Sequence, residues 1–222
     1  MAKRRKVGNV MALPVLALLV ERPMHPYEMG TALRMRHKED SIKINYSSLY
    51  TVVGNLEKHG FVEVVSTHRE GRRPERTVYR ITDSGREELE DWIRDLISRP
   101  EKEFPRFEAA LSLLPVLPPD EVIELLRGRL RTLDQQVAGR AGALEQGSKD
   151  IPRLFHVESE YALVLLRAEA DWIRSLLTEL EAGTLTGVAA WRSLHATGRM
   201  PEEWLALQHR QNTQQPEAGT DE

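Results

Sequence analysis

Short hydrogen-bonding side chains recur on one side of a segment in the N-terminal half of the chain. The apolar residues of this segment recur at i, i+3, i+4 and i+7, which predicts a helix with one buried face: they are Leu49, Val52, Val53 and Leu56. The other face carries small polar residues, a lysine and no acid, namely Ser47, Ser48, Thr51, Asn55 and Lys58, with Tyr50 beside them. Such groups bind base edges and phosphates, so this spacing favours nucleic-acid recognition.

A basic segment follows the helix, between two runs rich in β-branched and aromatic residues at 61–65 and 77–81. This pattern predicts a two-stranded hairpin with a basic tip. Its cations are Arg69, Arg72, Arg73 and Arg76. We expect these arginines to contact phosphates or an adjacent minor groove.

Further elements must position these groups. Residues 10–20 predict a buried first helix with Leu13, Leu16, Ala17 and Val20 on its inner stripe, and a second helix begins near Tyr27. Residues 42–44 fit a short first strand. Residues 82–97 predict a fourth helix, started either by a capping box of Ser84 with Glu87 or by Thr82. Three helices, a hairpin and a connecting helix form the winged-helix arrangement.

The charge is unevenly distributed. The net charge is −3, but residues 1–80 hold 15 lysines and arginines against 8 acids, whereas the remainder holds 16 against 26. We therefore expect only the N-terminal part to face nucleic acid. Residues 1–8, with the charged run at 3–6, are expected to form a flexible basic arm, which fits either a phosphate contact or an ordinary solvated terminus. The basic arm and the apolar run after it also resemble a secretory signal, but the run lacks a cleavage site and is too short to span a bilayer.

Two long helical patterns occupy the C-terminal half, one after Pro118 and one over 152–180. The second has near-heptad spacing, which favours packing against another helix. We expect dimerisation through Leu154, Tyr161, Leu165, Ala168, Trp172 and Leu176. A monomeric helical bundle is the alternative. A homodimer would read a two-fold operator.

Several chemistries lack their residues. The chain has no cysteine, which excludes thiolate metal sites and a cysteine nucleophile. Its seven histidines show no metal-ligand spacing, and no Walker loop or nucleophile elbow is present. We therefore expect no metal, no cofactor and no enzymatic activity.

The motifs taken together resemble the PadR-like family of transcriptional regulators, over residues 10–98 most specifically. The resemblance rests on Pro26-Tyr27-Glu28, Ser48-Leu49-Tyr50, the glycine at 60 after Leu56-Glu57, the Arg-Arg-Pro wing and the run from Tyr79 to Gly85. It implies that Tyr27 touches a DNA phosphate, although a core aromatic would also fit. It also implies release of DNA by a small aromatic or drug-like effector in some members. Trp92 would stack against that effector, unless it is a packing residue.

The expected protein is mainly α with a small β wing. Residues 1–100 would form a winged helix-turn-helix DNA-binding domain with its arm and connecting helix, residues 101–208 a helical dimerisation domain, and residues 209–222 a disordered tail. We expect a cytoplasmic homodimeric transcriptional regulator, acting as a repressor on double-stranded operator DNA and not at a membrane. The competing hypotheses are a winged-helix module that docks proteins and an enzyme on a helical scaffold.

Overall fold

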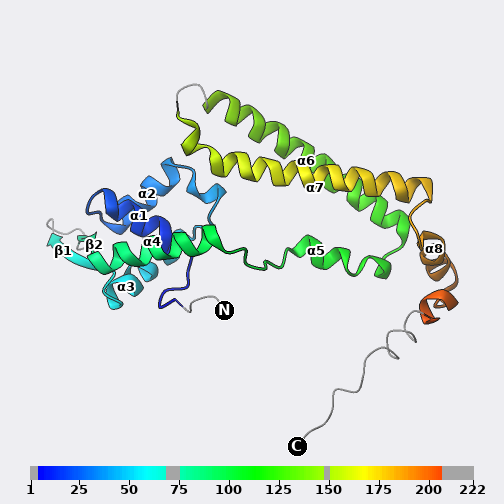
Figure 1. The fold of residues 1–222 in the computed structure, drawn as a ribbon, viewed down its shortest axis with the longest axis horizontal. Helices are drawn as coiled ribbons and strands as arrows, with labels where there is room; N and C mark the ends of the chain where they lie inside the picture. Colours follow the sequence, from blue (N-terminus) through cyan, green and yellow to red (C-terminus); the bar gives the residue numbers. More distant parts are fainter. Residues whose placement is uncertain (1–4, 69–75, 148–150, 207–222) are drawn as a thin grey trace, which may run out of the picture. The chain divides into compact units, whose positions relative to one another are not determined.

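A computed structural model describes residues 5–68, 76–147 and 151–206. The chain divides into two compact units, Met1–Glu103 and Phe104–Glu222, each of which is described by itself (Figure 1). The first is a winged helix-turn-helix unit and the second consists of helices. The expected fold class, mainly α with a two-stranded wing, is confirmed. The residues expected to form a C-terminal tail lie outside the described residues.

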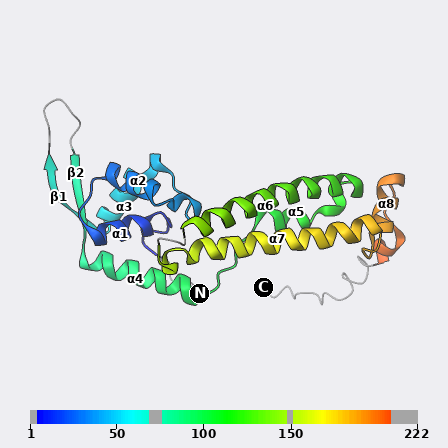
Figure 2. The same cartoon turned by 90° about the horizontal axis from the view of Figure 1, so that it is seen from above.

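The N-terminal unit packs its other helices around α1 (Ala12–Glu21), and a hairpin extends from one side of the unit (Figures 1 and 2). The other helices are α2 (Pro26–Met35), α3 (Leu49–Lys58) and α4 (Asp83–Ser98), with short 3-10 turns at Lys38–Asp40 and Tyr46–Ser48. The strands β1 (Val62–His68) and β2 (Arg76–Ile81) pair antiparallel, and their register shifts between Val64 and Ser66. Such a shift is typical of a bulge, which bends the strand locally.

A third chain segment joins the hairpin, but it is not the segment that the sequence indicated. Residues 42–44 form no strand, so that expectation is wrong. Met24 pairs with Tyr79 instead, through two backbone hydrogen bonds of 3.0 Å. The wing is therefore joined directly to the residue that precedes the N-cap of α2.

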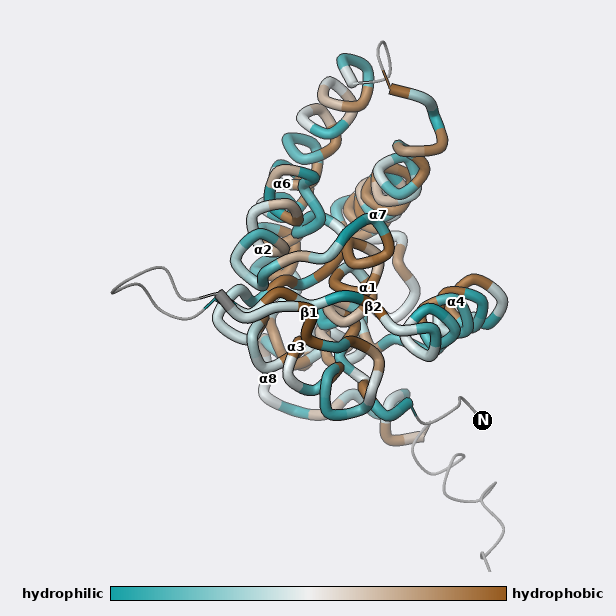
Figure 3. Tube along the Cα trace, turned by 90° about the vertical axis from the view of Figure 1, so that its left-hand side faces the viewer, coloured by the Kyte–Doolittle hydropathy of each residue, from teal (hydrophilic) through white to brown (hydrophobic). Residues whose placement is uncertain are grey.

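The buried surface of helix α1 is wider than the single stripe that the sequence predicted. Leu16 is buried as expected, but Ala17 and Val20 are exposed, whereas Val15 and Leu19 are buried. The hydropathy colouring shows α1 as hydrophobic and α4 as a mixture of both kinds of residue (Figure 3). A helix that is apolar on most sides is typical of the centre of a core, where a single stripe cannot be read from periodicity.

Two glycines allow α3, the hairpin and α4 to pack closely. Gly60 ends α3 with φ of +74°, the left-handed conformation that glycine adopts without a steric cost. Gly85 lies against the neighbouring backbone, because a Cβ there would be 2.0 Å from the carbonyl oxygen of Phe61. Thr82 is the N-cap of α4, and its hydroxyl accepts from the Gly85 amide and donates to the Gly60 carbonyl. The Thr82 start is therefore correct, and Ser84 lies inside the helix.

The C-terminal unit is built on two long antiparallel helices, α6 (Pro119–Gly147) and α7 (Val157–Ala182), which run side by side (Figures 1 and 2). The antiparallel alignment agrees with the ion pairs Arg127–Glu181 and Arg174–Asp134, at 2.8 and 2.5 Å. The shorter elements are α5 (Arg106–Leu111), α8 (Val188–Thr197) and the 3-10 turns Leu114–Val116 and Arg153–Phe155.

Helix α7 has two apolar faces. One face is buried in the helical core and comprises Leu163, Ala170, Ile173, Leu177 and Leu180. The other is exposed and holds most of the expected dimerisation residues, which we call the α7 outer face: Tyr161, Leu165, Ala168 and Trp172, with Val157 and Val164. Leu154, in the preceding 3-10 turn, is also exposed, whereas Leu176 is half-buried against the core.

Candidate nucleic-acid interface

The start of α3 is held by side-chain hydrogen bonds. The side-chain oxygen of Asn45 accepts from the Ser47 amide at 3.1 Å and from the Ser47 hydroxyl at 2.7 Å. The Ser48 hydroxyl donates to the Asn45 carbonyl at 3.0 Å. Both serines, expected to contact DNA, therefore already donate within the turn, and their hydroxyl oxygens remain available as acceptors.

The expected recognition residues lie together on the outer face of α3. Leu49, Val52, Val53 and Leu56 are buried as the periodicity indicated, while Thr51, Asn55 and Lys58 are exposed. Ser47 is exposed and Ser48 half-buried. The Tyr50 side chain is 58% exposed beside them. The outer face also contains Gly54, which sequence reasoning missed, although its spacing from Thr51 and Lys58 places it in the same row.

An acid borders this face. Glu57 is exposed on α3, near Tyr50 in helical position. Burial raises the pKa of Tyr79 on β2, and the charge of Glu57 and its hydrogen bond to the tyrosine raise it further. The Glu57 carboxylate is therefore engaged with the hairpin, and the row formed by Ser47, Thr51, Gly54 and Lys58 contains no acid.

His25 joins α2 to α3 and to the wing. Its Nδ1 accepts from the Tyr27 amide at 3.1 Å, and its own amide donates to Glu28 at 3.2 Å, which completes a reciprocal cap on α2. Its ring meets the Tyr50 ring edge-on, with centroids 6.1 Å apart. Burial lowers the pKa of His25, and the positive charge of Arg76 lowers it further, while Glu28 acts in the opposite direction. The cap needs the neutral ring, because a protonated imidazole cannot accept a hydrogen bond.

Tyr27 and Arg76 are available at the surface. Tyr27 is 70% exposed at the first turn of α2, so it is not a core aromatic, and Arg76 is exposed at the start of β2. Arg69, Arg72 and Arg73 lie outside the described residues.

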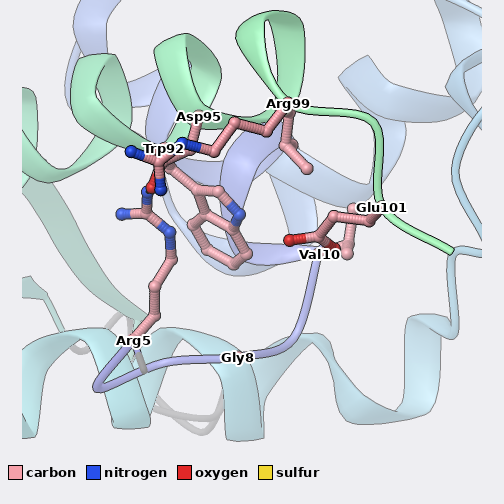
Figure 4. A pocket seen from close by; sticks show the side chains of 8 residues that line it. Arg5, Gly8, Val10, Trp92, Asp95, Arg99 and Glu101 are labelled. Carbon is pink, nitrogen blue, oxygen red and sulfur yellow. Dashed lines mark hydrogen bonds and ion pairs between the residues drawn. The ribbon is translucent and has the colours of Figure 1, made fainter. Parts of the chain in front are cut away.

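Trp92 lies under the N-terminal arm. The indole is 6% exposed, and the Arg5 guanidinium carbon lies 5.2 Å from the ring centroid (Figure 4). Arg5 also donates to Glu88 at 2.8 Å, to Asp95 at 2.6 Å and to Asp91 at 3.4 Å. Burial disfavours the charge on Arg5, but its hydrogen bond to Glu88 and the charges of all three acids outweigh this effect and raise the pKa of Arg5.

A cavity of about 220 Å³ adjoins the indole and is lined also by Val10, Leu96, Arg99 and Glu101 (Figure 4). It combines an aromatic edge and aliphatic groups with a guanidinium. Arg5 covers one side of Trp92, so a planar ligand in this cavity would meet the indole beside Arg5.

Within residues 5–68, 76–147 and 151–206, no group of three histidine, cysteine, aspartate or glutamate side chains could hold a metal ion. None of the helices described there combines the length and the apolar character needed to cross a membrane.

Comparison with known proteins extends these observations. Residues 15–91 match the model of the transcriptional regulator PadR-like family. Two structures of Bacillus subtilis PadR share the fold over 99% of their own chains. The complex with operator DNA is 22% identical, covers 77% of this chain and has a TM-score of 0.62. The complex with p-coumaric acid is 20% identical, covers 78% and has a TM-score of 0.63.

The Vibrio cholerae virulence activator AphA is also similar, at 17% identity and a TM-score of 0.55, over 77% of this chain and 98% of its own. No curated protein sequence matches the chain significantly. The family match covers the helix-turn-helix and the wing, where the exposed α3 face lies, and the shared fold continues into the helical unit. The winged-helix part of the chain, residues 15–91, thus matches the PadR-like family of transcriptional regulators, and solved PadR structures share its fold.

Proposed function

We propose that the protein is a homodimeric repressor that acts in the cytoplasm on operator DNA and is released by a small effector. The observation that carries the proposal is the exposed, acid-free row on α3, which lies opposite the buried face of the helix. A winged helix inserts such a face into the major groove, where base edges are read by hydrogen bonds.

The contacts would have two roles. Thr51, Asn55 and Tyr50 would contact base edges, while Lys58 and Arg76 would contact phosphates. Tyr27 lies at the first turn of α2, where its exposed hydroxyl suits a phosphate oxygen. Ser47 and Ser48, whose hydroxyls already donate to Asn45, would accept hydrogen bonds from base amino groups in the major groove. Arg69, Arg72 and Arg73 belong to the wing segment and would add to the phosphate contacts.

Dimerisation is supported by the α7 outer face. Its tyrosine is 66% exposed, and an exposed row of large apolar side chains on a folded helix favours an interface with another protein. A second copy would bury this row and place two α3 helices on the half-sites of one operator.

The effector proposal rests on the cavity beside Trp92. Trp92, Val10 and Leu96 in its lining suit a planar ring, and Arg99, which pairs with Asp95 at 3.6 Å, could pair with an acidic group of the ligand instead. The related PadR structure with p-coumaric acid supports an aromatic acid as the first candidate. We expect the protein to repress transcription. The structurally similar AphA is an activator, which is the opposite direction.

The test is binding of the full-length protein to a labelled duplex from upstream of its own gene, with excess random competitor and increasing salt. Specific binding that falls steeply with salt supports the proposal. Asn55→Ala should weaken specific binding more than non-specific binding, whereas Arg76→Ala should weaken both and reduce the salt slope by about one. Release by p-coumaric acid, tested against Trp92→Leu, would support the effector site. Absence of salt-dependent DNA binding at any sequence would favour the protein-docking alternative.

A further inference from the structure

Gly54 lies in the middle of the outer face of α3. It is exposed and follows Thr51 by three residues and precedes Lys58 by four, so these residues form one row along the helix. The four buried residues of α3 all lie on the opposite side. Gly54 therefore lies on the side of α3 that faces away from the core, between Thr51 and Lys58.

The fold of the chain does not explain a glycine at this position. A Cβ at Gly54 would meet no atom within 4 Å, and the residue has no positive φ. Nearby glycines differ: a Cβ at Gly30 would be 3.3 Å from Leu49, Gly60 has a positive φ, and a Cβ at Gly85 would collide with backbone. Glycine is the weakest helix former except proline, so Gly54 lowers the helical stability of α3 without improving its packing.

Gly139 and Gly142 of α6 are equally open, so openness alone assigns no role. Gly54 differs from them because it lies between Thr51 and Lys58 in the exposed, acid-free row of α3. We propose that Gly54 is a specificity-determining position for duplex DNA, at which the missing side chain lets the α3 backbone approach the base edges of the major groove closely. This inference rests on the proposed DNA binding and deepens it.

The neighbouring side chains explain why close approach matters. Thr51 and Asn55 have short side chains, which reach base edges only if the helix axis lies deep in the groove. A methyl group or larger side chain at position 54, between Thr51 and Lys58, would contact the groove floor first and hold these groups away from it. The loss would affect sequence reading more than phosphate contacts, because Tyr27 and Arg76 belong to other elements.

The decisive variant is Gly54→Ala, because it should stabilise the fold but weaken binding to the selected duplex. Alanine should raise the unfolding temperature by about 2 °C or more, since it favours the helix and meets no neighbour. It should weaken binding to the duplex that the wild-type protein selects from a randomised pool by at least about tenfold, comparable to one mismatched base pair. Binding to random duplex should change by less than about twofold.

The matched control is Gly142→Ala on α6, where a Cβ also meets nothing within 4 Å. It should raise stability in the same direction and leave selection and affinity unchanged. Gly54→Leu, which keeps a good helix former but adds bulk, should abolish preference for the selected duplex while the protein stays folded and retains its mass in solution.

The possible results separate the inference from the proposed function. If the wild-type protein selects no sequence, the proposed function is wrong and the inference falls with it. If it selects a sequence and Gly54→Ala binds that duplex as tightly as wild type, only the inference is overturned. A lower unfolding temperature for Gly54→Ala also overturns it, because the glycine would then have a role inside the fold.

Discussion

Single residues in the winged-helix unit perform two different tasks, which are to close the fold and to orient helices α2 and α3. Gly85 belongs to the first group, because it allows α4 to touch the backbone at Phe61. His25 belongs to the second, because it caps α2 and contacts the Tyr50 ring on α3. Substitutions of Gly85 and of His25 should therefore have different effects on the protein.

Gly85→Ala should destabilise the protein by about 3 kcal/mol, because the new methyl group would lie 2.0 Å from the Phe61 carbonyl oxygen and the backbone must shift. Urea unfolding followed by circular dichroism measures the change. Gly8→Ala is the control, since a Cβ there meets nothing within 4 Å. Equal stability of the two variants would show that α4 does not need this close approach.

His25 should make stability pH-dependent. Burial and Arg76 lower its pKa in the folded state, so the unfolded chain binds the proton more readily. Stability should be constant above the ordinary histidine pKa of about 6.5 and should fall as the pH decreases below it. His25→Asn retains a capping oxygen that does not titrate, so it should lose less stability between pH 7.5 and pH 5.5 than the wild type.

The measurement is the thermal unfolding midpoint of both proteins at the two pH values, with the other six histidines present in each. His25→Ala, which has no cap, should be less stable than His25→Asn at pH 7.5 by about 1 kcal/mol. Parallel pH profiles for wild type and His25→Asn would contradict a role for the neutral ring.

At the scale of elements, Arg5 links the N-terminal arm to α4 through ion pairs. Arg5 has a nearly buried side chain and contacts Glu88, Asp91 and Asp95, which repel one another without it. The basic arm, considered as a phosphate contact in the sequence, therefore uses Arg5 within the fold. An arginine suits this task because its planar group donates in several directions and stacks on an indole.

Arg5→Ala should lower the free energy of unfolding by about 1–2 kcal/mol, because three partly exposed carboxylates lose their counterion and Trp92 loses its cover. Lys6→Ala, at an exposed neighbour, should have little effect. The difference should shrink in 1 M salt, where charge repulsion is screened. A loss equal to that of Lys6→Ala would show that the cluster adds no stability.

At the scale of the whole molecule, DNA recognition by two half-sites requires a stable dimer. The α7 outer face is the apolar surface that we propose for this contact, because the opposite face of α7 is occupied by α6. Loss of this contact should leave each winged helix folded but reduce affinity for a two-fold operator.

Leu165→Asp should halve the mass in solution and weaken binding to the selected duplex by at least about tenfold, since a charge would be buried in the dimer contact. Light scattering and circular dichroism distinguish a monomer from an unfolded chain. Met200→Asp is the control, because Met200 is an exposed apolar residue outside α7. A dimer of unchanged affinity would move the interface elsewhere on the molecule.

Local patterns in the sequence determined the helices, the hairpin and their order. The buried face of α3 follows from a spacing of three and four residues, and the end of α3 follows from Gly60. These features depend on backbone hydrogen bonds and side chains within one or two turns, which a short window of sequence contains. The resemblance of the motifs also led to the family whose model matches residues 15–91.

For several elements, the covered face depends on contacts with distant segments, and the sequence did not reveal it. Met24, rather than residues 42–44, joins the wing, and Arg5 meets Asp95 ninety residues later in the chain. The heptad-like pattern of α7 contained both a core face and an outer face, and the pattern alone did not separate them. These outcomes depend on which distant segments compete for the same apolar surface, and periodicity within one element does not record its neighbours.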